Sequence, residues 1–232
     1  MQIPPHLINE HYDDRYFDVV DAFLEAKHIH LCGSNITERV KAFAQKGEVF
    51  RIAETGFGPG RVLIALMDSL EACASLNFKV QYSSAELYPL SVERMESILG
   101  AFKDRAGSHI RKMIAAYSSI DTSVSGWHSV DINLGAGVID FRLFAGEALQ
   151  MVLSLNNLCD AWFLDGHGPK KNPDIWRSEL LKAVGDKTAV NGTVTTYTVA
   201  GHVRRDLAAA GFTLEKTLGF GGKKEALRGI KR

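Results

Sequence analysis

Apolar and polar residues along the chain fall into stretches whose spacing predicts strands and helices in turn. Apolar runs with the length of a buried strand are found at 49–53, 78–86, 138–144, 159–164 and 192–198. Apolar residues that recur every third or fourth position, as on one face of a helix, are found at 62–74, 89–117 and 202–210. This alternation is typical of an open, mainly parallel α/β sheet.

The end of the chain departs from this alternation. Predicted strands at 212–218 and 225–230 follow each other without a helix and are joined by the Gly-rich turn 219–222. Two strands joined by so short a turn pair antiparallel, so we expect one antiparallel strand at this end of the sheet. The stretch 118–137 is polar and rich in turn-forming residues, and it predicts a loop.

Two predicted helical regions contain residues that indicate where a helix is interrupted or begins. The region 89–117 is expected to form a helical insertion at about 88–118, interrupted at Gly107-Ser108. The residues Pro173-Asp174-Ile175-Trp176 are expected to open a further helix, because proline is favoured in a first helical turn.

Residues 1–48 are expected to form an N-terminal extension packed on a domain that spans 49–232. Within it we expect a short strand at 28–31 and a helix at 37–44. Its expected anchors are the apolar and aromatic residues Tyr12, Tyr16, Phe17, Phe23 and Leu24. The extension is interpreted as a lid over one sheet edge, and a direct part in catalysis is the alternative.

A glycine-rich loop follows the predicted strand at 49–53. It consists of Glu54, Thr55, Gly56, Phe57, Gly58, Pro59 and Gly60, and a predicted helix comes directly after it. Glycines permit positive φ and bring a ligand close to a backbone without Cβ atoms, and the helix start supplies unpaired N–H groups. The loop therefore predicts a site for a nucleotide-like cofactor, although glycine clusters also occur in plain turns.

The spacing of these glycines narrows the choice of cofactor. Glycines 56, 58 and 60 differ from the G-x-G-x-x-G pattern of dinucleotide sites, and Pro59 removes an N–H donor that a pyrophosphate would use. The pattern thus favours a cofactor without pyrophosphate, such as S-adenosylmethionine.

Two acidic residues stand where ligands bind in open α/β sheets, at the carboxyl ends of predicted strands. Glu86 ends the second strand of a βαβ unit, where a carboxylate accepts hydrogen bonds from a ribose diol. Asp165 ends the run 159–164 and is followed by the loop residues Gly166, Gly168 and Pro169. An exposed glutamate and a helix-capping aspartate are the alternative interpretations.

Composition limits the function class. The 232 residues carry 27 Lys and Arg against 27 Asp and Glu, so no overall positive charge indicates nucleic acid, although 215–232 holds six basic residues against two acidic ones. Three widely spaced cysteines suggest neither a disulfide framework nor a metal site, and we expect no metal. The sequence shows no membrane span and no signal peptide, and we expect a cytoplasmic protein.

Several stretches resemble the methyltransferase domain of the bifunctional tRNA 5-methylaminomethyl-2-thiouridine biosynthesis protein, from about residue 12 to the end. The similar stretches are Asp13 to Phe17, Glu54 to Gly60, Gly126-Trp127-His128, Asp160 to Gly166 with Pro169, Asn172 to Trp176, Val203-Arg204-Arg205, Ala210-Gly211-Phe212 and Gly219-Phe220-Gly221.

The resemblance implies a class I S-adenosylmethionine-dependent methyltransferase, Rossmann-like, with a mostly parallel seven-stranded sheet and one antiparallel strand. It implies N-methylation of the aminomethyl group of 5-aminomethyl-2-thiouridine at the tRNA wobble position. The implied partners are the tRNA anticodon loop and the upstream enzymes that modify the wobble uridine. The chain corresponds to the methyltransferase part alone, so we expect no FAD, and we expect a monomer.

This sequence departs from the family at the residues that follow two of these motifs. Gly166-His167-Gly168-Pro169 stands where relatives have Gly-Phe-Ala-Pro, and Gly126-Trp127-His128-Ser129 stands where they have Gly-Cys-His-Arg. Gly222 replaces a usual arginine. The cofactor residues are thus better matched than those that would face the RNA.

Each candidate residue is given a role on this basis. Glu54 and the loop 55–60 are assigned to the methionine part of the cofactor, Glu86 to its ribose, and Gly146 and Glu147 to the adenine side. Asp165 is the candidate catalytic residue, because a carboxylate beside the transferred methyl would attract and orient the substrate ammonium and help to take its proton.

Candidates for contacts with tRNA are basic and aromatic. Phosphate contacts are expected from Lys170, Lys171, Arg204, Arg205, Lys223, Lys224 and Arg228. Trp127, His128 and His167 are expected to stack on or edge a flipped-out uracil, although Trp127 also suits a core and His167 a plain surface.

Three other functions remain open at this point. One is a methyl- or aminopropyltransferase that acts on another amine, and another is a nicotinamide-dependent oxidoreductase, which Pro59 disfavours. The third is a tRNA-binding module without catalytic activity.

Overall fold

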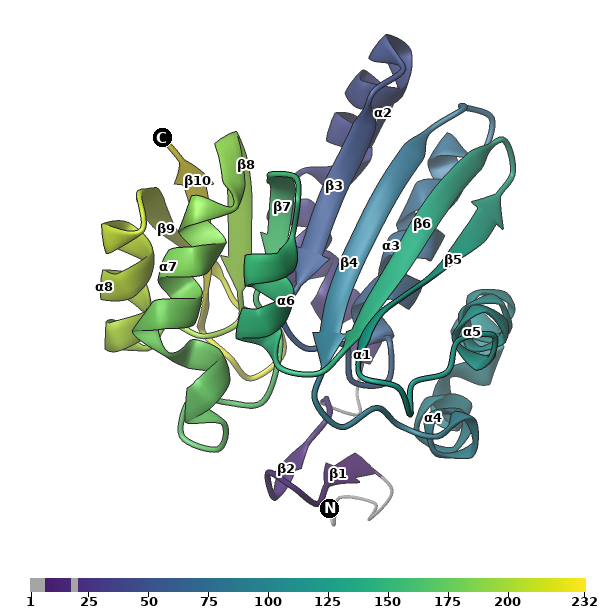
Figure 1. Cartoon of the computed structure of the whole chain (residues 1–232), viewed down its shortest axis with the longest axis horizontal. Coiled ribbons are helices and arrows are strands. Elements are labelled where there is room, and N and C mark those ends of the chain that lie inside the picture. Colours follow the sequence, from purple (N-terminus) through teal and green to yellow (C-terminus); the bar gives the residue numbers. More distant parts are fainter. Residues whose placement is uncertain (1–6, 18–20) are drawn as a thin grey trace.

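The computed structural model describes residues 7–17 and 21–232, so the parts of the predicted extension at 1–6 and 18–20 lie outside the described residues. Figure 1 shows one twisted sheet with helices on both faces. Its strands are β3 (Val49–Glu54), β4 (Lys79–Glu86), β5 (Gly126–Leu134), β6 (Gly137–Ala145), β7 (Cys159–Phe163), β8 (Thr188–Thr196), β9 (Phe212–Leu218) and β10 (Glu225–Lys231).

The sheet has eight strands among the described residues, in the order β5-β6-β4-β3-β7-β8-β10-β9. The central strands β6, β4, β3, β7 and β8 are parallel neighbours. Strand β10 lies antiparallel between β8 and β9, which confirms the antiparallel strand predicted from the Gly-rich turn. The prediction of seven strands is wrong by one, because β5 adds a second antiparallel strand beside β6.

Strand β5 occupies most of the predicted 118–137 loop. Its side chains alternate, with Trp127, Ser129, Asp131 and Asn133 exposed. Only its last inward residues, including Ile132, are fully buried. An edge strand with one solvated face can carry polar residues at every second position, and this explains why the stretch reads as a loop.

The helices are α1 (Ala22–Ala26), the π-helix η2 (Lys27–Cys32), α2 (Ile36–Lys46), α3 (Arg61–Leu70), the 3₁₀ turn η3 (Glu71–Cys73), α4 (Val92–Leu99), the 3₁₀ turn η4 (Gly100–Phe102), α5 (Lys103–Ser118), α6 (Ala148–Ser154), the 3₁₀ turn η5 (Pro173–Trp176), α7 (Ser178–Asp186) and α8 (Gly201–Ala209). Helices α2, α3 and α8 confirm the predictions for these segments. No helix of the described residues is long and apolar enough to cross a membrane.

Four local predictions are wrong. Residues 28–31 form part of η2, which continues α1 without a break, rather than a strand. Ile29, His30 and Leu31 are buried in this helical segment. The helical insertion breaks at 100–102 and at Ala106 (φ −135°, ψ 23°), and Gly107 remains helical. Pro173–Trp176 closes as its own 3₁₀ turn before α7, and β8 begins at Thr188, earlier than expected.

Neighbouring residues of each central strand point into different cores, because side chains alternate across a sheet. Ile52 packs into one core with helices α1 to α5, and Ala53 packs into the other with α6, α7 and α8. Phe17 and Phe23 of the N-terminal region belong to the first core, whereas the predicted anchor Leu24 is 41% exposed. The N-terminal region therefore packs on the face of the sheet to which Ile52 of β3 points.

The remaining strands, β1 (Ile8–Asn9) and β2 (Asp14–Arg15), form a separate antiparallel hairpin. Figure 1 shows this hairpin below the sheet, at the end where β4 terminates. The hairpin is thus placed at the carboxyl edge of the parallel strands, where ligands bind in such folds.

Candidate active site

The carboxyl ends of β3, β4, β6 and β7 surround one cavity of about 330 Å³. The residues that sequence analysis assigned to these ends, and that line the cavity, are Thr55, Gly56, Phe57, Gly58, Glu86, Gly146, Glu147 and Asp165. Parallel strands in register bring residues from distant parts of the chain to a common edge, and this confirms that these residues lie together.

The glycine-rich loop leaves its backbone open to the cavity. Gly58 has a φ of +53°, a region that glycine adopts without strain. A Cβ atom on Gly56 would lie 3.0 Å from the backbone oxygen of Asp165. The loop and the end of β7 therefore lie in close contact at Gly56, and a residue without a side chain allows the two backbones to approach in this way.

Glu86, the last residue of β4, presents a carboxylate that backbone N–H groups hold in place. Its Oε2 accepts a hydrogen bond from the Gly58 N–H at 2.8 Å, and its Oε1 accepts one from the Tyr88 N–H at 3.0 Å. Burial raises the pKa of Glu86, and these backbone donors act in the other direction. A carboxylate anchored by backbone N–H groups retains lone pairs for a second partner, which suits a ribose diol.

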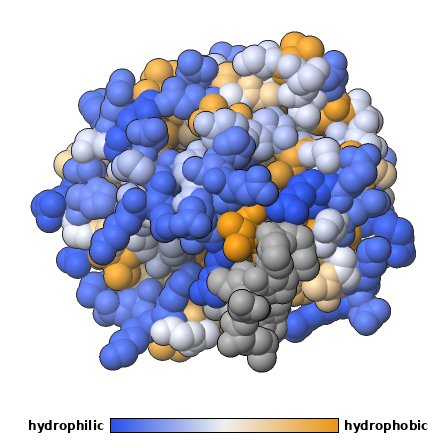
Figure 2. Space-filling model, turned by 90° about the horizontal axis from the view of Figure 1, so that it is seen from below, coloured by the Kyte–Doolittle hydropathy of each residue, from blue (hydrophilic) through white to orange (hydrophobic). Residues whose placement is uncertain are grey.

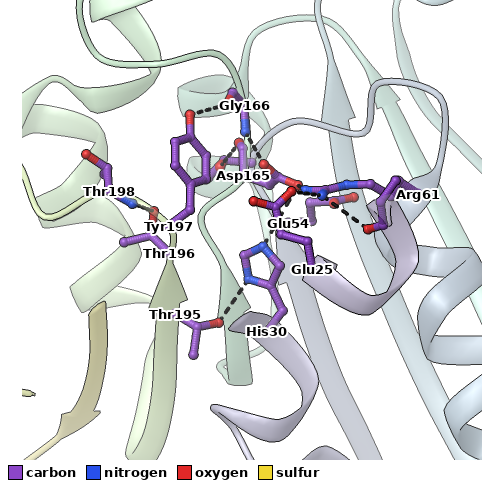
Figure 3. Close-up of polar contacts among 12 residues, drawn as sticks. Glu25, His30, Glu54, Arg61, Asp165, Gly166, Thr195, Thr196, Tyr197 and Thr198 are labelled. Carbon is purple, nitrogen blue, oxygen red and sulfur yellow. Dashed lines mark hydrogen bonds and ion pairs between the residues drawn. The ribbon is translucent and has the colours of Figure 1, made fainter. Parts of the chain in front are cut away.

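Asp165 is held by a buried arginine (Figure 3). The Nη2 of Arg61 donates to its Oδ2 at 2.7 Å, and the Gly166 N–H donates to its Oδ1 at 2.8 Å. Burial alone would raise the pKa of Asp165, but Arg61 outweighs burial and places this pKa below its ordinary value. Asp165 is therefore an ionised carboxylate with a defined direction and a low affinity for protons.

Arg61 connects Asp165 to a larger ionic cluster. Its Nη1 donates to the carboxylate of Glu25 at 2.8 Å, and the ammonium of Lys223 binds the other oxygen of Glu25 at 3.0 Å. Arg61 and Glu25 are both buried, so each charge is compensated by its partners. Sequence analysis missed Arg61 and Glu25, because neither belongs to a recognisable motif.

His30 is a second neighbour of Asp165. Its Nε2 lies 3.8 Å from the Asp165 carboxylate, and its Nδ1 faces the Thr195 hydroxyl at 3.1 Å (Figure 3). Complete burial lowers the pKa of His30 to about 4, although Asp165 acts to raise it. His30 is thus a neutral imidazole at physiological pH, and it offers Asp165 a polar neighbour without a full charge.

Two predicted cofactor residues do not line the cavity. The carboxylate of Glu54 accepts hydrogen bonds from the Tyr82 and Ser84 hydroxyls at 2.8 and 2.7 Å, and burial raises its pKa well above the ordinary value. Its assignment to the methionine part is therefore not supported. The Cβ position of Gly60 faces Met113 and Phe57 inside the protein, so Gly60 shapes the loop without reaching the ligand space.

The N-terminal hairpin supplies three residues that line the cavity, Asn9, Tyr12 and Tyr16. Tyr12 stands 4.8 Å from the ring of His167, and Tyr16 stands 5.7 Å from it, measured between ring centroids. The view in Figure 2, from the end where this hairpin lies, shows a mainly hydrophilic surface with scattered hydrophobic residues. The expected lid therefore contributes directly to the wall of the site.

The three residues expected to meet a uracil do not share one place. His167 lines the main cavity, whereas Trp127 and His128 line a separate hollow with Gln81, Ser83 and Arg142. Trp127 donates its indole N–H to the Ser154 hydroxyl at 3.0 Å, and the Nε2 of His128 faces the Val124 carbonyl at 2.8 Å. One base cannot contact all three side chains, because β5 carries two of them away from Asp165.

The predicted basic residues differ in their surroundings. Lys171 pairs with Asp13 at 2.8 Å, and Lys223 pairs with Glu25. Arg228 is half-buried within β10, with a buried Nε that has no partner. The exposed members of the set are Lys170, Lys171, Arg204, Arg205, Lys223 and Lys224.

One other cluster has the residue types of a metal site, namely Asp68, Glu71 and His109. The two carboxylates approach opposite nitrogens of the His109 ring, at 4.0 and 3.0 Å. The ammonium of Lys27 also pairs with Asp68. The contacts of His109 thus join α5 to α3 and η3.

Comparison with known families gives an independent result. The family described as S-adenosyl-L-methionine-dependent methyltransferase matches residues 110–232, which is more than half of the chain. The matched region begins in α5 and includes β6, β7 and the loop that carries Asp165.

Two curated relatives are named tRNA 5-methylaminomethyl-2-thiouridine biosynthesis bifunctional protein MnmC. The relative from Pseudomonas syringae pv. syringae is 32% identical over 221 residues, which cover 94% of this chain and 32% of that protein. The relative from Caulobacter vibrioides is 35% identical over 216 residues, which cover 93% and 35%. The chain thus spans about a third of the length of these relatives.

A solved structure has the same fold. The crystal structure of MNMC2 from Aquifex aeolicus superposes with a TM-score of 0.70 at 21% identity, over 96% of this chain and 65% of that one. The class I methyltransferase fold expected from the sequence is confirmed, with the mixed, mostly parallel sheet described above.

Proposed function

The chain belongs to the S-adenosyl-L-methionine-dependent methyltransferases, and on this basis we propose that it methylates the aminomethyl group of 5-aminomethyl-2-thiouridine at the tRNA wobble position. The product would be 5-methylaminomethyl-2-thiouridine. The proposal rests on one observation above the others, the oriented Asp165 carboxylate beside the glycine-rich loop. The names of the relatives that match most of the chain supply the substrate.

The cavity fits the methyl donor. Gly56 and Gly58 bring bare backbone to the cavity, and Glu86 offers an anchored carboxylate to the ribose hydroxyls. Gly146 and Glu147 line the side assigned to adenine. S-adenosylmethionine supplies an electrophilic methyl group on a sulfonium sulfur.

Asp165 would act on the amine. An aliphatic ammonium has a pKa of about 10, so it must lose a proton before its nitrogen can attack a methyl group. The ionised carboxylate attracts the amine and fixes its direction, and such alignment supplies much of the rate in transfer reactions. Because Arg61 depresses the pKa of Asp165, the carboxylate orients the amine and does not retain its proton.

The neighbours of Asp165 are no better as proton acceptors. The pKa of His30 is about 4, and burial also lowers the pKa of His167. We therefore propose that the amine binds in its neutral form, after its ammonium has released a proton to bulk solvent in the acid–base equilibrium that precedes binding. This proposal keeps the orienting role expected of Asp165 and differs from the expectation that Asp165 also helps to take the proton.

The RNA would be held by exposed basic side chains. Lys170 follows the Asp165 loop, and Lys224 lies in the turn before β10, next to the cluster of Lys223 and Glu25. Phosphate contacts of this kind position an RNA without reading its sequence.

The proposal is tested by transfer from S-adenosylmethionine with a labelled methyl group to tRNA isolated from cells that lack the protein. Label in a nucleoside with the mobility of 5-methylaminomethyl-2-thiouridine is the expected result. A parallel reaction with polyamines tests the alternative substrate class of free amines. Label in polyamines and none in tRNA would refute the proposal.

A further inference from the structure

The N-terminal hairpin crosses the mouth of the cavity from one strand end to another. On one side, His11 stacks on Tyr88, which follows β4, with ring centroids 3.9 Å apart and planes within 8°. On the other side, Tyr12 packs against His167, which follows β7. The turn of the hairpin therefore covers the region between the ribose carboxylate Glu86 and the reacting carboxylate Asp165.

Several contacts fix the hairpin in this position. Leu7 and Phe17, one at each end, are 1% and 4% exposed. Its acidic residues bind the loop after β7, since Asp13 pairs with Lys171 at 2.8 Å and Asp14 lies 3.4 Å from the Nδ1 of His167. The tyrosines that it carries are thus placed by buried and ionic contacts on both sides of the mouth.

Three rings gather at the reacting end of the cavity. His167 lies two residues after Asp165, and both Tyr12 and Tyr16 contact its ring. All three side chains are only partly exposed and line the cavity. The ring of Tyr16 also reaches the glycine-rich loop, where its Cδ1 lies 3.7 Å from the place of a Cβ on Gly58.

We propose that Tyr12, Tyr16 and His167 form the stacking site for the pyrimidine ring of the acceptor nucleoside, which directs its amine toward Asp165. This inference rests on the proposed function and names the residues that would hold its substrate. Proteins commonly hold unstacked bases on aromatic side chains, and each such contact contributes about 1–3 kcal/mol. Asn172 is buried, lines the cavity and hydrogen-bonds with the side chain of Tyr12, and its amide has a further donor and an acceptor for the edge of a pyrimidine.

His167 places this group of rings beside Asp165, while Tyr12 and Tyr16 also lie near Glu86 at the end of β4. The residues assigned to ribose and adenine, Glu86, Gly146 and Glu147, follow β4 and β6, whereas the ring that Tyr12 and Tyr16 share follows β7. The hairpin thus supplies aromatic side chains to the wall of the cavity near Asp165.

The test compares two anticodon stem-loop RNAs in binding experiments with S-adenosylhomocysteine present. One RNA carries 5-aminomethyl-2-thiouridine at the wobble position, and the other carries an abasic residue there. The Tyr12→Ala and Tyr16→Ala variants are expected to bind the first RNA about tenfold more weakly and the abasic RNA as the wild type does. Tyr12→Phe and Tyr16→Phe should keep wild-type binding, because the ring is retained.

Two controls separate stacking from other effects. Calorimetry with S-adenosylmethionine should give each variant a dissociation constant within about twofold of the wild type, since stacking on the acceptor leaves the donor site intact. His11→Ala loosens the hairpin outside the cavity and should preserve the preference for the modified RNA.

Two results would overturn the stacking site. One is an equal loss of affinity for both RNAs, and the other is a loss confined to the methyl donor. A wild-type protein that binds both RNAs equally and transfers no methyl group would instead refute the proposed function. The two failures are therefore distinguishable.

Discussion

Arg61 donates a hydrogen bond from its Nη2 to the Oδ2 of Asp165 across 2.7 Å, although 104 residues separate them in the chain. Arg61 opens the helix after the glycine-rich loop, and Asp165 follows β7. The pair therefore ties the part of the cavity assigned to the cofactor to the part proposed to hold the amine. It also fixes the charge of the carboxylate, and this determines several measurable properties.

Asp165→Asn keeps the shape of the side chain and removes its charge. We expect S-adenosylmethionine to bind this variant within a few-fold of the wild type, and methyl transfer to fall by about 10²-fold or more. Calorimetry and single-turnover transfer measure the two quantities. Full activity in this variant would exclude a role for the carboxylate in orienting the amine.

Arg61→Met leaves Glu25 and Asp165 buried without their shared cation. We expect the free energy of unfolding to fall by about 3–5 kcal/mol, as when one partner of a buried pair is removed. Because Arg61 lowers the pKa of Asp165, its removal raises that pKa, so activity should be lost at a higher pH on the acid side. Urea unfolding and a pH–rate profile test both effects, and Arg61→Lys should recover part of each.

His30 makes stability depend on pH. Its pKa is about 4 in the folded protein and about 6.5 in an unfolded chain, so protonation favours unfolding. The wild type should therefore lose about 3 kcal/mol through this residue as the pH falls from 7 to 4. Unfolding of the His30→Gln variant should lack this part of the acid dependence, and identical pH curves for both proteins would contradict the assignment.

Gly60→Ala is expected to strain the loop for two reasons, the backbone conformation of Gly60 and the side chains that surround it. Its φ is +79°, and an added Cβ would lie 3.0 Å from Met113 and from Phe57. Gly47→Ala is a matched control, because Gly47 has a φ of +70° and nothing within 4 Å of the new Cβ. We expect a loss of about 1 kcal/mol for Gly47→Ala and a clearly larger loss, with weaker cofactor binding, for Gly60→Ala.

Binding of tRNA should weaken as salt rises, because phosphate contacts release counterions. Lys224→Ala and Lys170→Ala should each weaken binding and reduce the salt slope by about one. Lys46→Ala is the control, since helix α2 lies at the opposite end of the molecule from the hairpin (Figure 1). A salt slope that neither Lys224→Ala nor Lys170→Ala changes would argue against contacts between these lysines and tRNA phosphates.

The sequence predicted the parts of the site that depend on strand order alone. Glu86 and Asp165 were identified because each ends an apolar run, and parallel strands bring such ends together. The glycine-rich loop was identified by its spacing. These signals are local, and the chain carries them whatever its tertiary structure.

The residues that control Asp165 could not be found in this way. Arg61 and Glu25 reach Asp165 from other segments, and nothing in their neighbours along the chain indicates the contact. His30 was assigned to a strand, and only the turn of η2 points its ring toward Thr195. Trp127 and His128 were expected at the substrate because aromatic side chains stack on flipped-out bases, and β5 places them in a separate hollow.

The chain of contacts from Lys223 through Glu25 and Arg61 to Asp165 has a consequence for folding. Lys223 and Glu25 are 198 residues apart, so their contact requires both ends of the described chain to be in place. Contacts between such distant residues close large loops and form slowly. A partly folded chain therefore lacks the oriented Asp165 carboxylate even when its central strands have paired. Methyl transfer would then report that the segments carrying Glu25 and Lys223 have both folded into place.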